Sequence, residues 1–259
     1  MSDPSLDSAS VQRFKAVVEY DGTAYHGWQL QSNVPTIQGE LERVLATILQ
    51  APTRIHGAGR TDAGVHATGQ VAHFDAGWRH SPEALHRACN ALLPPDIAVR
   101  SICKVSDRFH ARHSAATKTY VYRILNHPTP SPLKRLYSWH ISEPLDMSLM
   151  GRAAEYLPGS HDFAAFGSPT DGTPSTVREV MDARWEAHDH TLQFTVRGTG
   201  FLRYMVRSLV GTLVMVGRQK IPPEEFREVL MSKKRSLAGP TAPALGLCLV
   251  QVEYEGECE

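Results

Sequence analysis

The chain has 259 residues, enough for one large domain or two ordinary ones with a core that needs no covalent support. Hydrophobic residues make up 42% and charged residues 21%, which excludes a disordered polyelectrolyte and a fibrous repeat. The 27 Lys and Arg residues balance the 27 Asp and Glu residues, so any attraction to a polyanion must come from local segregation of charge.

The first residues carry no pattern of a targeting segment. Residues 1–10 contain no Lys or Arg and no apolar block, unlike a secretory signal, and we expect residues 1–12 to form a disordered tail. The most apolar later stretch, 205–217, is interrupted by Arg207 and is too short to span a bilayer. We therefore expect a cytoplasmic protein with no membrane partner.

The first half of the chain alternates strand and helix patterns. Apolar and polar residues alternate along 14–20, which predicts a strand, and apolar residues then recur at helical spacing along 37–49, after Thr36 as a helix cap. A loop of small residues follows at 57–64. The remaining predicted elements are a strand at 70–74, a helix from Ser81-Pro82 to before Pro94-Pro95, and a strand at 97–105.

The second half repeats this organisation. Its predicted elements are a strand at 118–125, a helix from Asp146 through 157, a hairpin of 178–186 and 192–197, a helix at 200–216, a helix from Pro222-Pro223 and a strand at 247–254. The order predicts two α+β subdomains that share or abut their sheets. We place the boundary between Arg112 and Lys118, which gives an N-terminal subdomain of residues 13–114 and a C-terminal subdomain of residues 115–259.

Positive charge gathers in two segments, one from each half. Residues 100–123 hold six basic side chains and one acid, and residues 197–220 hold five basic side chains and no acid. Aromatic residues are interleaved with the arginines in both segments, as in surfaces that bind unstacked bases. The two segments can line one groove for a phosphate backbone, or they can simply solvate helix and strand faces.

The segment 57–67 is the most unusual in the chain. Glycines and alanines surround Arg60 and Asp62, so a large partner can approach the backbone closely. A nearby guanidinium favours the ionised form of a carboxylate, and a rigidly held aspartate can act as a nucleophile or a base. An aspartate that merely closes a glycine turn fits the same residues, and the spacing alone leaves both interpretations open.

A metal site and a nucleotide cradle are weaker interpretations of this region. His56, His66 and His73 lie near Asp62, but no H-E-x-x-H pattern links them, and the glycines lack the Rossmann and Walker spacings. The four cysteines lie far apart without a C-x-x-C pair. We therefore expect no metal and no cofactor, and we keep a metal hydrolase centred on His66 and His73 as an alternative.

An ordered series of motifs resembles the bacterial tRNA pseudouridine synthase A family from about residue 13 to about residue 254. The matching blocks are Tyr20-Asp21-Gly22-Thr23, Gly27-Trp28-Gln29, Gly59-Arg60-Thr61-Asp62-Ala63-Gly64-Val65-His66, Asp96-Ile97-Ala98-Val99, Phe109-His110-Ala111-Arg112, His161-Asp162-Phe163, Phe201-Leu202, Met205-Val206-Arg207 and Gly246-Leu247. Such a series is far more specific than any single motif.

The resemblance implies the pseudouridine synthase fold, an α+β structure of two α/β subdomains with a mixed, mainly antiparallel central sheet and a basic cleft between them. It implies isomerisation of uridine to pseudouridine at positions 38, 39 and/or 40 of the tRNA anticodon stem-loop, by a homodimer and without a cofactor. A non-catalytic RNA-binding protein is the alternative from another class.

The resemblance also implies roles for individual residues. Asp62 matches the catalytic aspartate, Tyr120 the tyrosine that stacks on the target base, and Arg207 the basic partner of the aspartate. The other implied contacts are Leu247 against the base, Arg60 with a phosphate or the flipped nucleotide, and Phe109, His110 and Arg112 with the RNA. A core tyrosine, a helix-surface arginine and a core leucine are the structural alternatives for Tyr120, Arg207 and Leu247.

Overall fold

The computed structural model describes residues 10–169 and 174–255. The strands are β1 (Val11–Tyr20), β2 (His56–Gly57), β3 (His66–Gly77), β4 (Ile97–Val105), β5 (Ala115–Asn126), β6 (Trp139–Ile141), β7 (Gly159–Asp162), β8 (Val177–His188), β9 (Thr191–Gly198) and β10 (Leu247–Tyr254). The helices are α1 (Ile37–Leu49), α2 (Pro82–Leu92), α3 (Met147–Ala154), α4 (Met205–Gly217) and α5 (Pro223–Ser232), with short 3-10 turns at Arg235–Leu237 and Ala244–Gly246.

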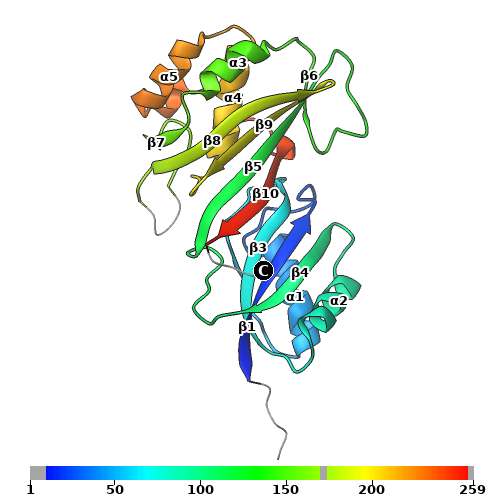
Figure 1. The fold of residues 1–259 in the computed structure, drawn as a ribbon. Coiled ribbons are helices and arrows are strands. Elements are labelled where there is room, and N and C mark those ends of the chain that lie inside the picture. Colours follow the sequence, from blue (N-terminus) through cyan, green and yellow to red (C-terminus); the bar gives the residue numbers. More distant parts are fainter. Residues whose placement is uncertain (1–9, 170–173, 256–259) are drawn as a thin grey trace, which may run out of the picture.

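A single sheet runs through both halves of the described chain (Figure 1). Its order is β4-β1-β3-β10-β5-β9-β8-β7, with β2 beside β3 and β6 beside β5. The pairs β10–β3 and β5–β6 are parallel, and the other pairs are antiparallel. The expected α+β class with a mixed, mainly antiparallel sheet is confirmed.

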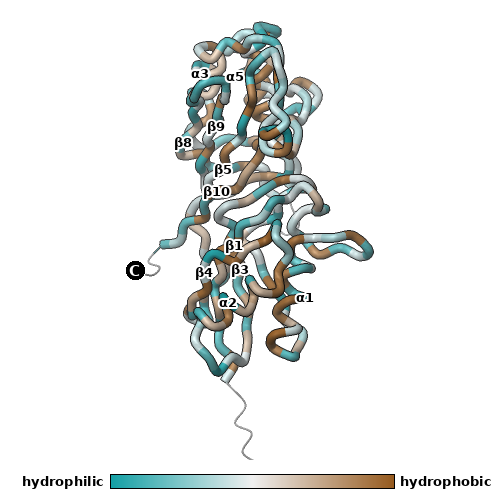
Figure 2. The backbone as a smooth tube through the Cα atoms, turned by 90° about the vertical axis from the view of Figure 1, so that its right-hand side faces the viewer, coloured by the Kyte–Doolittle hydropathy of each residue, from teal (hydrophilic) through white to brown (hydrophobic). Residues whose placement is uncertain are grey.

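Strand β10, near the C-terminus, joins the two halves of the sheet. It pairs with β3 through Cys248 opposite His66 and Leu249 opposite Ala67, and with β5 along a longer antiparallel ladder. Figures 1 and 2 show β10 and β5 in the middle of an elongated molecule, with α1 and α2 toward one end and α3 and α5 toward the other. The loop before β3 therefore lies where the two halves meet.

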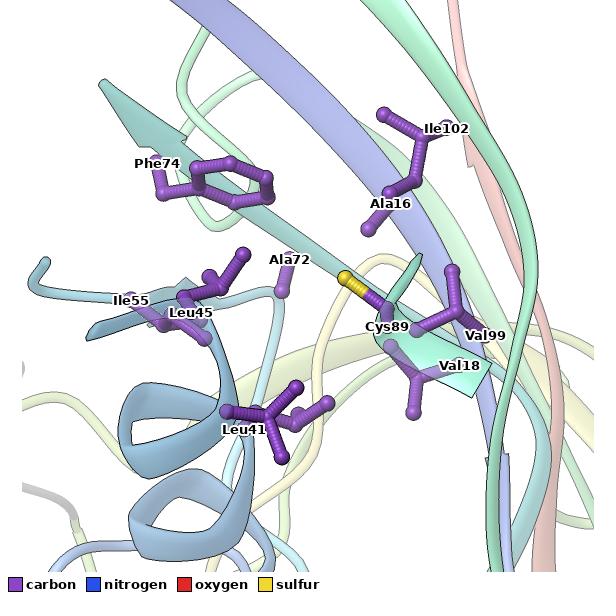
Figure 3. A pocket seen from close by; sticks show the side chains of 11 residues that line it. Ala16, Val18, Leu41, Leu45, Ile55, Ala72, Phe74, Cys89, Val99 and Ile102 are labelled. Carbon is purple, nitrogen blue, oxygen red and sulfur yellow. The ribbon is translucent and has the colours of Figure 1, made fainter. Parts of the chain in front are cut away.

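Helices α1 and α2 pack on β1, β3 and β4. The side chain of Thr36 accepts a hydrogen bond from the backbone N–H of Gly39, so it caps α1 as expected. This core contains a cavity of about 10 Å³. Figure 3 shows the apolar side chains that line it, among them Leu41, Phe74 and Cys89. It has room for about one water molecule and offers it no polar partner, so it belongs to core packing.

Helix α4 is enclosed on nearly every side. Apart from Arg207 and Met215, all of its residues are buried, as expected for a helix that is apolar all round. Gly211 is needed there because a Cβ would lie 1.7 Å from the carbonyl oxygen of Pro240. None of the helices in the described part of the chain combines the length and apolar character that crossing a membrane requires.

Several element boundaries differ from those predicted. The helix expected from residue 200 begins at Met205, because Tyr204 has a left-handed φ of 65° and Arg203 bridges to Ser168. The helix capped by Asp146 ends at Ala154 instead of 157, and the strand expected at 70–74 extends over His66–Gly77. Strand β1 begins at Val11, and residues 1–9 of the expected tail lie outside the described residues.

Candidate active site

Buried groups hold in place the loop 58–65, which carries Asp62. The hydroxyl groups of Tyr20 and Thr61 are hydrogen-bonded at 2.8 Å, and the amide of Gln70 donates to the carbonyl oxygen of Gly59 at 2.9 Å. Gly27 has a φ of 90°, and a Cβ there would lie 2.5 Å from the carbonyl oxygen of Thr61. Only glycine allows the backbone to approach the loop this closely.

Asp62 opens a tight turn and points toward the other half of the chain. Its carbonyl oxygen accepts from the N–H of Val65 at 3.1 Å, and Gly64 takes a φ of 76° within the turn. Its carboxylate oxygen Oδ2 accepts from Nη1 of Arg207 at 3.0 Å. Among the described residues no donor reaches Oδ1. That oxygen is therefore the one available to a substrate.

Arg207 is fixed in several directions at once. Its Nε donates to the carbonyl oxygen of Ala242 at 2.7 Å, and the N–H of Ala242 donates back to the carbonyl oxygen of Arg207. Its guanidinium also lies 5.5 Å from the ring centroid of Tyr204. A guanidinium held in this way gives the carboxylate of Asp62 a fixed partner, so both groups are preorganised.

Tyr120 lies on β5, close to this ion pair. Its ring packs edge-on against Phe201, with centroids 5.1 Å apart, and it is 8% exposed. Burial raises the pKa of the Tyr120 hydroxyl, and the nearby Tyr20 and Asp62 raise it further. The hydroxyl therefore remains a neutral phenol near the carboxylate.

Leu247 forms part of the wall beside the loop. It is buried and begins β10 opposite Tyr122, and the next residue, Cys248, pairs with His66 at the end of the loop. The hydroxyl of Tyr122 donates to the carbonyl oxygen of Pro243 at 2.7 Å. This bond fixes the segment that leads from the Arg207 contact to Leu247.

Arg60 is exposed at the outer side of the loop. Its Nε donates to the side-chain oxygen of Gln29 at 3.0 Å. The guanidinium is thus oriented by a residue of the Gly27-Trp28-Gln29 motif and remains accessible to a ligand in solvent.

Phe109, His110 and Arg112 lie in different surroundings, although they are close in sequence. The ring of Phe109 is buried and packs 5.0 Å from that of Tyr254. His110 packs 4.6 Å from His73, and Arg112 is exposed. Contact of these residues with RNA stays a prediction, and the burial of Phe109 makes packing its main role.

The histidines named as alternative metal ligands belong to separate clusters. His73 packs against His56 and His110, whereas Nδ1 of His66 accepts from the N–H of Gly22, and its Nε2 lies 3.0 Å from the carbonyl oxygen of Leu136. In residues 10–169 and 174–255, no group of three or more His, Cys, Asp or Glu side chains is arranged to hold a metal ion.

Two contributors to the site were not singled out from the sequence. Nζ of Lys118 donates to the carbonyl oxygen of Ala58 at 2.7 Å, and Tyr204 packs against the guanidinium groups of Arg203 and Arg207. Lys118 precedes Tyr120 by two residues on a strand, which places both on one face and was a usable signal. No sequence signal indicates the left-handed backbone of Tyr204.

The chain is similar to proteins of known family along almost its whole length. A family model described as tRNA pseudouridine synthase matches residues 16–114 and 153–255. Proteins named tRNA pseudouridine synthase A from Thermoanaerobacter sp. (strain X514), Acetivibrio thermocellus and Myxococcus xanthus are 45%, 43% and 45% identical. These alignments cover 92%, 94% and 93% of the chain and 98%, 100% and 92% of the relatives, respectively. Asp62 lies in the first matched segment, and Arg207 and Leu247 lie in the second.

Proposed function

Because the chain belongs to the tRNA pseudouridine synthase family and is an isomerase of tRNA uridines, we propose that its targets are the uridines at positions 38, 39 and/or 40 of the anticodon stem-loop, with Asp62 as the catalytic nucleophile or base. The observation that supports the site most directly is the ion pair between Asp62 and Arg207, which joins the two halves beside Tyr120.

The reaction needs a charged group held in a fixed position, and it involves no oxidation or reduction. The N1–C1′ glycosidic bond breaks, the uracil turns while it stays bound, and a C5–C1′ bond forms. The proton at C5 is lost and N1 gains one, so no atom is added and no electron acceptor is required. A fixed carboxylate with one oxygen free is suited to attack C1′, to add to C6 of the base, or to remove a sugar proton.

Tyr120 and Leu247 are the proposed contacts of the target base. The ring of Tyr120 supplies a flat surface for stacking. Leu247 is apolar and begins β10 beside the end of the loop 58–65. The Tyr120 hydroxyl is the candidate for accepting the C5 proton late in the reaction. Because its pKa is raised, the hydroxyl stays protonated until then and passes its own proton to a neighbour in the same step in which it accepts the C5 proton.

A uridine in a stem must leave the helix before it can reach Asp62, at a cost of a few kcal/mol. We assign part of the compensation to the exposed Arg60, as a contact for a phosphate or for the flipped nucleotide, and to the basic segments of both halves. Arg112 and His110 are the further proposed RNA contacts. We also propose a homodimer in which one tRNA touches both subunits, and a cytoplasmic location.

Incubation of the full chain with unmodified tRNA, followed by site-resolved detection of pseudouridine, tests the proposal. We expect product at one or more of the three positions and its loss in Asp62→Asn. Asp189→Asn is the matched control, because Asp189 lies in the β8–β9 turn with a φ of 52° that asparagine tolerates. Retention of tRNA without any isomerisation by the unaltered chain would favour the RNA-binding alternative instead.

A further inference from the structure

A lysine unused by the proposed chemistry lies beside the loop 58–65. Nζ of Lys118 is 2.7 Å from the carbonyl oxygen of Ala58, and it would be 3.5 Å from a Cβ placed on Gly59. The β5–β9 register is regular from Lys118 to Leu125, so Lys118 and Tyr120 point to the same side of the sheet. Two residues along a strand separate them by about 7 Å.

Two arginines from other elements lie close enough to Lys118 to act on its charge. Burial first, and then the positive charges of Arg112 and Arg178, lower the pKa of Lys118 from 10.5 to about 8. Arg178, on β8, donates from Nη1 to the carbonyl oxygens of Ser175 and Val177. The loop after β4 and strands β5 and β8 therefore bring three cations together next to the loop of Asp62.

Lys118 and Arg178 differ from several cations of the basic segments. Arg100, Arg197 and Arg218 are each paired with a glutamate at 2.9, 2.7 and 3.1 Å, respectively. Within the described ranges, no carboxylate lies within ion-pairing distance of Lys118 or Arg178. An ammonium group has three N–H donors. Within the described residues, the ammonium of Lys118 donates only one hydrogen bond, to the carbonyl oxygen of Ala58. Partly buried cations that repel one another are stabilised by an anion.

We propose that Lys118 and Arg178, with Arg112 beside them, bind a phosphodiester of the RNA strand adjacent to the nucleotide held at Asp62. The identity of the RNA rests on the proposed function. A phosphodiester carries one negative charge and two free oxygens, which matches the unused donors of an ammonium and a guanidinium. Gly59 leaves the space next to Nζ open, and the bond to Ala58 links the phosphate to the loop that carries the catalytic carboxylate.

The test uses an anticodon stem-loop in which cytidine replaces the target uridine, so that binding is measured without turnover. The linkage on the 5′ or the 3′ side of that nucleotide is made neutral as a methylphosphonate. We expect Lys118→Met and Arg178→Gln each to weaken binding about tenfold, and to lower the slope of log affinity against log salt by about one. Neutralising the contacted linkage should weaken binding by the unaltered chain to a similar extent.

The decisive result is the coupling between the two changes. If Lys118 or Arg178 contacts that phosphate, each substitution combined with the neutral linkage costs no more than either change alone. If Lys118 only stabilises the loop, the loss of affinity from the substitution and the loss from the neutral linkage multiply, whichever linkage is neutral. That result overturns the inference. Arg178→Gln keeps the test valid if Lys118→Met fails to fold, because Arg178 donates its hydrogen bonds to Ser175 and Val177 and not to the loop 58–65.

Lys104→Met is the matched control. Lys104 is exposed on the edge strand β4 and belongs to the same basic segment, so any loss of affinity it causes should be the same whichever linkage is neutral, with no coupling to either. The coupling is read with an unreactive RNA. Its absence therefore refutes the phosphate site even if the unaltered chain isomerises tRNA, and its presence supports the site even if isomerisation fails.

Discussion

The guanidinium of Arg207 lies 3.0 Å from the carboxylate of Asp62, although the two residues are 145 positions apart in the chain. Asp62 comes from the loop before β3 and Arg207 from α4, so the pair forms only when both halves are folded around β10. The side chain of Asp62 is 21% exposed and that of Arg207 is 15% exposed. This partial burial weakens screening by solvent and strengthens the ion pair.

Replacing Arg207 should affect chemistry more than binding. Arg207→Gln removes the positive charge beside Asp62, and we expect the single-turnover rate of pseudouridine formation to fall about 10²-fold. Affinity for the cytidine stem-loop should change much less. Arg203→Gln is the control, because Arg203 is exposed and packs on the same Tyr204 ring without reaching Asp62. Equal losses of rate in both variants would contradict the role assigned to Arg207.

The two parts of Tyr120 should separate by substitution. Tyr120→Phe keeps the ring, so we expect nearly normal affinity and a rate reduced about 10²-fold through loss of the hydroxyl. Tyr120→Leu should also weaken binding of the stem-loop by about 1–3 kcal/mol, since the stacking surface is gone. Binding titrations and single-turnover rates on the same preparations distinguish the effects. A fully active Tyr120→Phe would remove the hydroxyl from the mechanism.

Gly27 should be intolerant of any side chain. In Gly27→Ala the new Cβ would meet the carbonyl oxygen of Thr61 at 2.5 Å, and a φ of 90° is strained for alanine. We expect a loss of about 2 kcal/mol in the free energy of unfolding and a displaced Asp62 with reduced activity. Urea denaturation and the isomerisation assay measure both.

Gly151→Ala is the matched control for this prediction. Gly151 lies within α3, and apart from the adjacent backbone of the helix no atom of the described residues lies within 4 Å of the position that its Cβ would take. This variant should be more stable by about 0.5–1 kcal/mol, because alanine favours a helix interior, and it should remain active. Similar behaviour of both variants would show that the contact between Gly27 and Thr61 is unimportant.

His73 should make the fold sensitive to acid. Burial, with the neighbouring His110 and His56, lowers the pKa of His73 from 6.5 to about 4. Between these values the unfolded chain binds a proton that the folded chain does not, so stability falls as the pH drops through this window. The side chain is only 3% exposed, and we expect it to account for a loss of about 2 kcal/mol between about pH 7 and about pH 5.

His73→Asn should reduce this pH dependence. Asparagine offers an oxygen near the position of Nδ1, which accepts from the N–H of Ala111 at 3.1 Å, and it does not titrate. Urea denaturation of both proteins at the two pH values gives the difference. An unchanged pH dependence would mean that other groups cause the loss of stability in acid.

The sequence by itself determined the elements whose causes are local. The strands predicted at 97–105 and 247–254 have the bounds of β4 and β10, and Thr36 and Ser81 marked the starts of α1 and α2. Strand pleat and helix capping act within a few residues of chain, so they are visible in a sequence window. The motif around Asp62 is likewise a continuous stretch of chain, so its glycines, arginine and aspartate could be recognised together.

Only the tertiary structure decided how distant segments meet. In the folded chain β10 lies between β3 and β5, and α4 begins after the bridge between Arg203 and Ser168. The ammonium of Lys118 is hydrogen-bonded to the carbonyl oxygen of Ala58. These features depend on pairing and packing between residues far apart in the chain, where the surrounding contacts override local preference. The loop could therefore be identified from its residues. The residues that hold the loop in place and pair with its carboxylate could be identified only from the complete fold.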